Sequence, residues 1–246
     1  MQYIGIIPAR YASQRFPGKP LVKIKGVSMI KRVFDQAKKT NLLSHVLVAT
    51  DDERIYDHVN EFGDVVLTSS RHPSGTDRCF EAARKISATW GISDTDVIVN
   101  IQGDEPYIQP HQIEQLCSCF HESSAQIATL IKKIDDPDSV KNPNIVKVVS
   151  DKQKQALYFS RSPIPYFRNT AVQPGKQIPT YYKHIGMYAY RYGVLRDITQ
   201  LPPSDLECTE SLEQLRWLEN GFVIKINVTE TESLSIDTPA DLNHFV

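Results

Sequence analysis

The feature that most constrains the fold is a regular alternation of short apolar runs with helical patterns over the first hundred residues. The apolar runs have strand length and cover residues 3–7, 45–50, 64–67 and 96–101, and the helical patterns between them cover residues 28–39, 52–61 and 76–86. Such an alternation predicts a mostly parallel sheet with helices on both faces, right-handed crossovers and a ligand crevice at the carboxyl ends of the strands. The predicted fold class is therefore α/β.

The pattern changes after about residue 145. Strand-like segments at 145–150, 156–160 and 181–190 surround the proline-rich segment 161–179, and a helix at 206–220, a strand at 222–228 and a helix at 238–245 follow. We expect a small antiparallel excursion from the sheet, with residues 160–190 as a hairpin that contacts a second copy, because tyrosine tends to anchor protein interfaces. An ordinary sheet edge covered by its own helix is the alternative. No linker divides the chain, so residues 1–246 are predicted to form a single domain.

Length and charge limit the function. A chain of 246 residues can bury one substantial core, and its net charge of -1 supplies no general field for nucleic acid. No signal-like segment starts the chain and no apolar run approaches the ~18 residues that span a bilayer, so we expect a cytoplasmic protein without membrane insertion. The four cysteines lack zinc or redox spacing and are predicted to be reduced structural thiols.

A cationic loop follows the first strand. Pro8 is expected to end that strand, and Arg10, Arg15 and Lys19 then lie on one short connection in which Gly18 would let the backbone approach a bulky anion. Neither G-x-G-x-x-G nor G-x-x-x-x-G-K-[ST] occurs there, so side chains would have to supply the phosphate donors. A solvated basic surface loop is the alternative interpretation.

Two acidic segments complete the candidate chemistry. Asp104 and Glu105 follow the fourth strand in a glycine turn, where hard oxygen ligands suit Mg²⁺, although a solvated turn is the alternative. If the first and fourth strands are neighbours where the strand order reverses, Asp104 lies beside the cationic loop. Asp237 is by position alone more typical of a helix N-cap than of a metal ligand, and the sequence does not bring it near Asp104.

Seven segments in this order resemble the CMP-Kdo synthetases, or 3-deoxy-manno-octulosonate cytidylyltransferases. They are residues 7–19, 72–78, 100–106, 158–165, 184–186, 212–216 and 236–239. The resemblance covers the chain from end to end. It implies a nucleotide-diphospho-sugar-transferase-like fold, a homodimer, and the coupling of CTP to Kdo with release of pyrophosphate, in lipopolysaccharide synthesis.

Two other functions stay open. One is a cytidylyltransferase for another acidic sugar, such as 8-amino-Kdo or sialic acid, although sialic-acid relatives usually carry a Gly-Gly-Ser-Lys type of loop where this chain has residues 11–15. The other is a nucleotide-binding module without turnover, against which the presence of both Asp104 and Asp237 argues.

The resemblance also implies roles for the acids and cations. Arg10 and Lys19 would hold the triphosphate, with Ser13 and Arg15 as neighbours. Asp104 and Asp237 would carry Mg²⁺, which reverses the preference for Asp237 as a cap. Arg10, Lys19, Asp104 and Asp237 are thus the predicted catalytic residues.

The same resemblance places cytosine recognition at the start of the third helix. Its predicted residues are Ser74, Gly75, Thr76, Arg78 and Gln102. Ser74 and Thr76 also fit an N-cap pair. Asp77 stands where many relatives have glutamate.

The Kdo pocket is predicted from the resemblance to use Arg161, His184, Glu210 and Gln214. By residue type alone, Arg161 fits an exposed hairpin, His184 a satisfied buried histidine, and Glu210 and Gln214 an i, i+4 pair on one helix face. Cys208 and Thr209 depart from the more usual His-Ile of relatives.

Overall fold

In the computed structural model, the structure describes residues 1–12, 15–168, 179–232 and 234–244. The amino-terminal half contains β1 (Tyr3–Ala9), the hairpin β2 (Lys23–Ile24) and β3 (Val27–Ser28), α1 (Met29–Ala37), β4 (Leu43–Thr50), α2 (Glu53–Asn60), β5 (Asp64–Leu67), α3 (Gly75–Trp90), β6 (Val97–Asn100) and α4 (Pro110–Ser118). The rest contains β7 (Ile127–Lys133), β8 (Lys147–Ser150), β9 (Ala156–Ser160), β10 (Tyr182–Arg191), α5 (Tyr192–Ile198), α6 (Asp205–Glu210), α7 (Gln214–Glu219) and β11 (Ile224–Val228). Short 3-10 turns form at Lys19–Leu21, Cys119–His121, Pro137–Lys141 and Pro239–His244.

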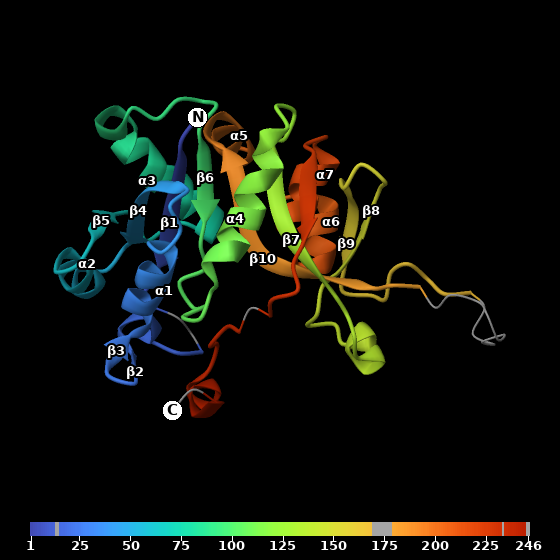
Figure 1. Ribbon diagram of the computed structural model, residues 1–246, viewed down its shortest axis with the longest axis horizontal. Helices are drawn as coiled ribbons and strands as arrows, with labels where there is room; N and C mark the ends of the chain where they lie inside the picture. The colour runs from blue at the N-terminus through green and yellow to red at the C-terminus, as the bar shows by residue number, and fades with distance from the viewer. Residues whose placement is uncertain (13–14, 169–178, 233, 245–246) are drawn as a thin grey trace.

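One sheet organises the molecule, with the strand order β11-β7-β10-β6-β1-β4-β5 (Figure 1). β1 pairs in parallel with β4 on one side and with β6 on the other. The strand order therefore reverses at β1, which opens a crevice at the carboxyl ends of β1 and β6. This confirms the predicted α/β class and the predicted neighbourhood of the first and fourth strands.

Apolar residues alternate between the two faces of the sheet. Ile4 and Ile6 pack with α3, α5 and α7 on one face, and Ile7 and Ala9 pack with α1, α2 and α4 on the other. All four side chains are buried, because the strands lie between two helical layers. Both faces are thus covered, as the alternation of strands and helices predicts.

β1 continues through Pro8 to Ala9, so the prediction that Pro8 ends the strand is wrong. Pairing with β6 stops at Ile6, whose carbonyl accepts a hydrogen bond from Ile101 N at 2.9 Å. Pro8 lies two residues on and faces the same edge, where β6 no longer needs a donor. Pairing with β4 continues to Ala9 and holds the strand in place.

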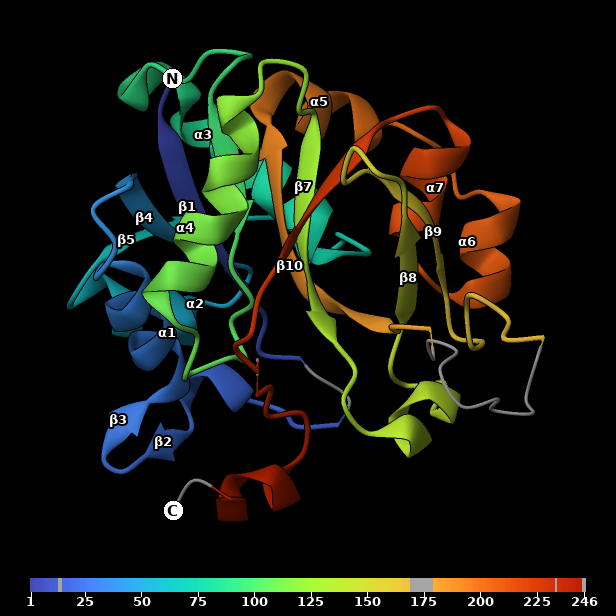
Figure 2. The same ribbon diagram turned by 45° about the vertical axis from the view of Figure 1, so that its right-hand side comes forward.

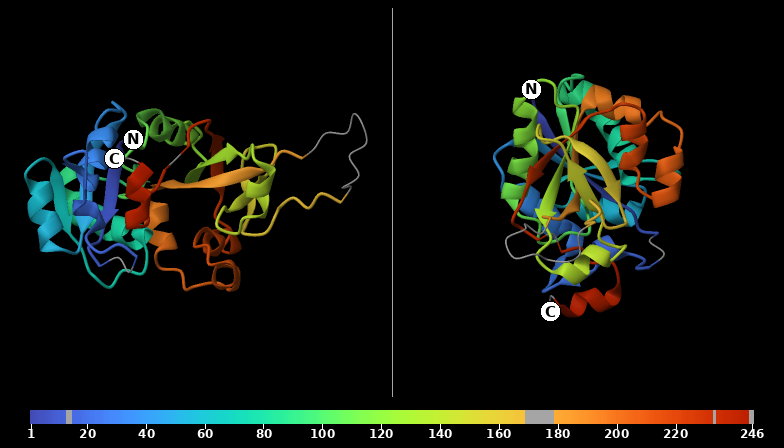
Figure 3. Two further views of the ribbon diagram at one scale, coloured as in Figure 1. Left: turned by 90° about the horizontal axis from the view of Figure 1, so that it is seen from below. Right: turned by 90° about the vertical axis from the view of Figure 1, so that its right-hand side faces the viewer.

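β10 lies inside the sheet, antiparallel to both β6 and β7, rather than in an excursion. Tyr188 and Tyr190 are buried there, with ring centroids 5.1 and 5.5 Å from that of Trp217. These two tyrosines are core residues and cannot anchor a dimer. The antiparallel departure is instead the β8–β9 hairpin, after which residues 161–168 extend away from the sheet (Figure 3).

The predicted helix at 206–220 is two helices, α6 and α7. Ser211 adopts a left-handed backbone with φ of 52°, which ends α6 and turns the chain. α6 has no buried residue, whereas Leu215 and Trp217 of α7 enter the core. The turn at Ser211 lets α6 stay at the surface while α7 packs against the core. The prediction of one continuous helix is therefore wrong.

Residues 107–144 received no predicted element, yet they contain α4 and β7, an internal strand of the sheet between β11 and β10. The apolar run at 127–131 was the available signal for β7. None of the helices in the described part of the chain is long and apolar enough to cross a bilayer.

The chain after β11 passes the end of β10 and reaches the carboxyl-terminal 3-10 turn beside β2 and β3 (Figure 2). Ile236 is fully buried there with Ile24 and Met29. The Asp241 carboxylate accepts hydrogen bonds from Asp237 N at 2.9 Å and Thr238 N at 2.8 Å. Asp241 therefore caps this turn, which leaves the Asp237 carboxylate free of that role.

Candidate active site

Two adjoining cavities open at the carboxyl ends of β1 and β6. The first has a volume of about 240 Å³ and the second of about 480 Å³, and Gln102 and Asp104 line both. Of the predicted nucleotide residues, the first cavity is lined by Arg10, Arg15, Lys19, Ser74, Gly75, Arg78 and Gln102. Ser13 lies outside the described residues.

Gly18 shapes the cationic loop through its own backbone. Its φ is 72°, and its N–H donates to the Tyr11 carbonyl at 2.9 Å. A Cβ at this position would lie 3.1 Å from the Tyr11 ring. The glycine is therefore required for a left-handed turn against an aromatic ring, and this turn starts the 3-10 segment that carries Lys19.

Lys19 brings the two predicted acidic segments together. Its Nζ lies 2.7 Å from Asp104 Oδ2 and 3.6 Å from Asp237 Oδ1, and Arg15 Nη2 lies 2.9 Å from the same Asp237 oxygen. The backbone contributes too, because Ile236 N donates to the Asp104 carbonyl at 3.0 Å. Asp237 thus reaches Asp104 although 133 residues separate them in the sequence.

Gly103 allows the two strand ends to approach each other. A Cβ on Gly103 would lie 2.7 Å from the Pro8 carbonyl oxygen, closer than real Cβ contacts. Any side chain would therefore push the turn that carries Asp104 away from the loop that carries Lys19. The glycine in the sequence Gln-Gly-Asp-Glu marks this close approach.

The carboxylates of Asp104 and Asp237 face one cation, and hard oxygens of this kind are suitable Mg²⁺ ligands. Within the described residues, no group of three or more His, Cys, Asp or Glu side chains gathers at any point. The rest of a metal's coordination would have to come from phosphate oxygens and water, which is the usual manner of Mg²⁺ binding at nucleotides. The donor set therefore fits a metal shared with a ligand.

The start of α3 forms another wall of the first cavity. Ser74 caps the helix by accepting from Asp77 N at 3.2 Å, and its hydroxyl donates to Asp77 Oδ2 at 2.6 Å. Thr76 points elsewhere, because its hydroxyl donates to Glu213 Oε2 at 2.9 Å and it does not line the cavity. The predicted cap pair is therefore the single cap Ser74. Burial raises the pKa of Glu213 despite this hydrogen bond.

Arg78 is a buried cation with two partners that the sequence analysis missed. Its guanidinium donates to Thr68 Oγ1 at 2.6 Å and to Asp51 Oδ2 at 3.1 Å. Asp51 directly follows β4 and Thr68 directly follows β5. Their positions at the carboxyl ends of parallel strands were the signal that could have identified them.

Glu81 holds the loop that enters α3. Its carboxylate accepts from Ser69 N at 2.8 Å, contacts His72 Nε2 and lies 2.9 Å from Lys85 Nζ. Burial alone would raise the pKa of Glu81, but these hydrogen bonds outweigh it and lower the pKa to about 2. The carboxylate is therefore ionised, and it fixes His72, which lines the first cavity.

Gln102 and His184 belong to the second cavity. Gln102 Nε2 donates to the Gly186 carbonyl at 2.9 Å, which joins the end of β6 to β10. His184 Nε2 lies 2.9 Å from Thr129 Oγ1. Burial lowers the pKa of His184 to about 3, so the ring is neutral at pH 7.

The other three predicted sugar residues line neither cavity. Arg161 donates from Nε to the Glu210 carbonyl at 2.7 Å and from Nη1 to the Pro143 carbonyl at 3.0 Å. The Glu210 carboxylate accepts from Ser160 Oγ at 2.6 Å and from Arg161 N at 2.9 Å. Gln214 is buried on the neighbouring helix α7, so Glu210 and Gln214 do not share one helix face. The role of these residues toward a sugar stays a prediction.

Cations around an anion-sized cavity, beside a carboxylate pair at a strand switch point, define a nucleotidyltransferase type of site. A family model described as Cytidylyltransferase matches residues 4–230, and the chain therefore belongs to this family.

Relatives and one solved structure specify the match further. A 3-deoxy-manno-octulosonate cytidylyltransferase from Parabacteroides distasonis is 55% identical over 98% of this chain and 96% of its own, and one from Bacteroides thetaiotaomicron is 54% identical over 99% and 96%. A structure of CMP:2-keto-3-deoxy-manno-octonic acid synthetase complexed with CTP superposes with a TM-score of 0.91, at 40% identity over 99% of this chain and 96% of that one. The predicted resemblance to the CMP-Kdo synthetases is confirmed. A 4-diphosphocytidyl-2C-methyl-D-erythritol synthase at 12% identity and a TM-score of 0.65 shares the fold alone.

Proposed function

We propose that the protein transfers CMP from CTP to Kdo and releases pyrophosphate, a step of lipopolysaccharide synthesis. The single observation that carries this proposal is the convergence of Lys19, Asp104 and Asp237 in the first cavity, where Asp104 also lines the second. One cavity has the cations for a triphosphate, and the other adjoins it across Gln102 and Asp104. Relatives named for this activity, at more than half identity over nearly the full length, support the assignment.

The chemistry requires positioning rather than a protein nucleophile. The anomeric hydroxyl of Kdo attacks the α-phosphorus of CTP in line and loses its proton to water, a new P–O bond forms, and the bond to the pyrophosphate oxygen breaks. Arg10 and Arg15 line the first cavity, where they would neutralise the triphosphate and the departing pyrophosphate. Lys19, which lines the same cavity, would stabilise the negative charge of the phosphates as well.

We infer that Mg²⁺ is the cofactor and that Asp104 and Asp237 hold it. When bound, the ion would neutralise phosphate oxygens that two carboxylates alone would repel. Lys19 now lies between these carboxylates, so it is the side chain that would turn toward phosphate as the metal enters.

The test is pyrophosphate release from CTP with Kdo, 8-amino-Kdo or sialic acid, each with Mg²⁺ and with EDTA. We expect turnover with Kdo and Mg²⁺ and its loss in EDTA. Release with another acidic sugar alone would reassign the substrate. CTP binding without pyrophosphate release from any sugar would indicate a nucleotide-binding module, and unchanged turnover in EDTA would contradict the metal.

We further propose a homodimer formed through the β9 hairpin and the chain that follows it. Leu157 on β9 and Tyr166 beyond it are 60% and 83% exposed, and a second copy would cover these large apolar side chains. Light scattering should give twice the mass of one 246-residue chain, and Leu157→Lys should shift the protein toward the monomer.

A further inference from the structure

The second cavity contains one permanent positive charge among its described lining residues, and this charge is Lys183. Lys183 is the second residue of β10, next to His184, and its side chain is 22% exposed. His184 contributes no charge near pH 7, because desolvation lowers the pKa of its ring to about 3. Gln102, Asn144 and Ser235 offer neutral donors, so an anion that enters this cavity can form an ion pair there with Lys183 alone among the described lining residues.

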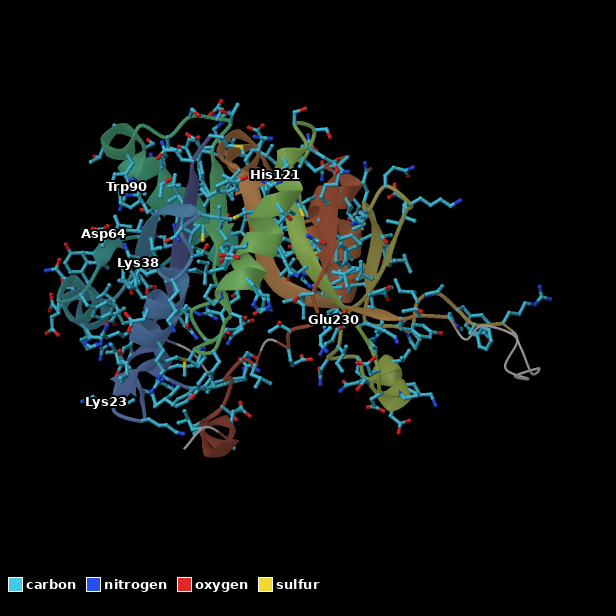
Figure 4. The ribbon with its side chains drawn as sticks, in the orientation of Figure 1. Lys23, Lys38, Asp64, Trp90, His121 and Glu230 are labelled. Atoms are coloured by element: carbon cyan, nitrogen blue, oxygen red, sulfur yellow. The ribbon has the colours of Figure 1, made fainter. Side chains whose placement is uncertain are left out.

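Glu232 forms an ion pair with Lys183 in this structure. Its Oε1 accepts from Lys183 Nζ, and its Oε2 lies 3.7 Å from Lys132 Nζ. The Glu232 side chain is 44% exposed and belongs to the segment that leaves β11, near the labelled residue Glu230 in Figure 4. A carboxylate on an exposed segment, bound to a cavity lysine, is a group that another carboxylate can replace.

We propose that Lys183 binds the carboxylate of the acidic sugar, and that Glu232 holds this lysine until the sugar replaces it. The proposal rests on the proposed function. It adds the residue that selects an acid over a neutral sugar, which the motif resemblance did not include.

The geometry of the substrate agrees with this assignment. In Kdo the carboxylate is attached to the carbon that carries the attacking hydroxyl, so both groups must lie in one cavity. Asp104 and Lys183 line the same cavity, which places a reaction-side carboxylate and a sugar-side cation within reach of one small ligand. Exchange of one carboxylate for another also keeps a counter-ion on this half-buried lysine.

The test compares Lys183→Gln, Glu232→Gln and the control Lys133→Gln. The control removes an exposed lysine from the end of β7, the strand that pairs with the start of β10. With saturating CTP, Lys183→Gln should raise the KM for Kdo about tenfold to a hundredfold, the usual effect of losing a hydrogen bond to a charged group. Glu232→Gln should lower this KM about twofold to fivefold, since it removes a weak, exposed competitor. Lys133→Gln should match the wild type.

A second readout separates binding from structure. The C1 carboxamide of Kdo, used as a competitive inhibitor, should lose less than twofold in affinity in Lys183→Gln, because it offers no charge to the lysine, and CTP binding should not change. An unchanged KM for Kdo in Lys183→Gln, or an equal loss for Kdo and its amide, would overturn this inference while an active wild type keeps the proposed function. A wild type that releases no pyrophosphate with Kdo would overturn the proposed function, and this inference with it.

Discussion

The two cavities differ in charge and in origin. Four cations line the first cavity, namely Arg10, Arg15, Lys19 and Arg78, whereas Lys183 alone lines the second among the described residues. Most of the first is built from loops after the parallel strands β1, β5 and β6, and most of the second from β10, residues 144–146 and the segment after β11. The cluster of cations in the first cavity fits the expected triphosphate. The second cavity has one lysine together with the carboxylates of Asp104, Glu105 and Glu232, which fits a ligand with a single carboxylate better than a triphosphate. The loops at the carboxyl ends of the parallel strands therefore supply most of the cations of the first cavity. The antiparallel strand β10 forms one wall of the second cavity.

The largest effect is expected at Asp104, which belongs to both cavities. Asp104→Ala should lower kcat by at least ~10²-fold, because it removes metal-borne stabilisation of the developing charge. Circular dichroism and thermal midpoint should stay close to the wild type. Asp135→Ala, an exposed carboxylate, is the matched control. Near-wild-type turnover in a folded Asp104→Ala variant would contradict the shared role.

A smaller effect, on the KM for one substrate only, is expected when Arg10 of the first cavity is replaced. Arg10 lines the first cavity and makes no ion pair with the described residues, so it is available to phosphate. Arg10→Gln should raise the KM for CTP about tenfold to a hundredfold and leave the KM for Kdo unchanged. The exposed Arg84→Gln serves as control. If both KM values rose together, the division between a nucleotide and a sugar cavity would be wrong.

A glycine-to-alanine change should have different effects on stability in the two cavities, at Gly103 in the first and at Gly186 in the second. Gly103→Ala places a methyl group 2.7 Å from the Pro8 carbonyl and should lower the free energy of unfolding by about 1–3 kcal/mol. Gly186→Ala in the second cavity meets no atom within 4 Å and should change it little. Urea unfolding of both variants measures the difference. Equal free energies of unfolding for the two variants would show that the backbone at residue 103 can move away from Pro8 without loss of stability.

Glu81 should give a stability effect with a defined pH window. Its pKa is lowered from 4.5 to about 2, so its stabilisation is complete above pH 4.5 and disappears as the pH falls toward 2. Glu81→Gln should lower the free energy of unfolding by about 1–2 kcal/mol at pH 7, since the amide oxygen keeps part of the hydrogen bonding. The difference from the wild type should vanish near pH 2. A difference that is constant with pH would argue against an ionised Glu81.

The smallest effect is expected at His184 in the second cavity. With a pKa of about 3, its ring should show no titration between pH 5 and 8 in histidine NMR spectra. The unfolded state takes up this proton near pH 6.5, so folding loses stability as the pH falls from about 6.5 toward 3. A ring that titrates near 6.5 would mean that the second cavity is wet enough to charge this histidine.

The prediction from sequence succeeded best where neighbouring residues decide the outcome. The βαβ alternation gave the parallel strands β1, β4, β5 and β6, and capping rules placed Ser74 at the start of α3. It failed where packing decides. Ser211 breaks the helix expected at 206–220, and Asp241 takes the cap expected from Asp237. β10 enters the centre of the sheet although its sequence resembles that of any strand.

The sequence by itself determined the fold class, the cationic loop and the acidic turn, because helix and strand periods and glycine turns are local properties of the chain. The tertiary structure alone decided that Asp237 meets Asp104 across Lys19, and that Lys183 meets Glu232 beside them. These pairs depend on strand order and on the path of the chain after β11. Contacts between distant segments are fixed by the packing of the whole core, which no local pattern encodes.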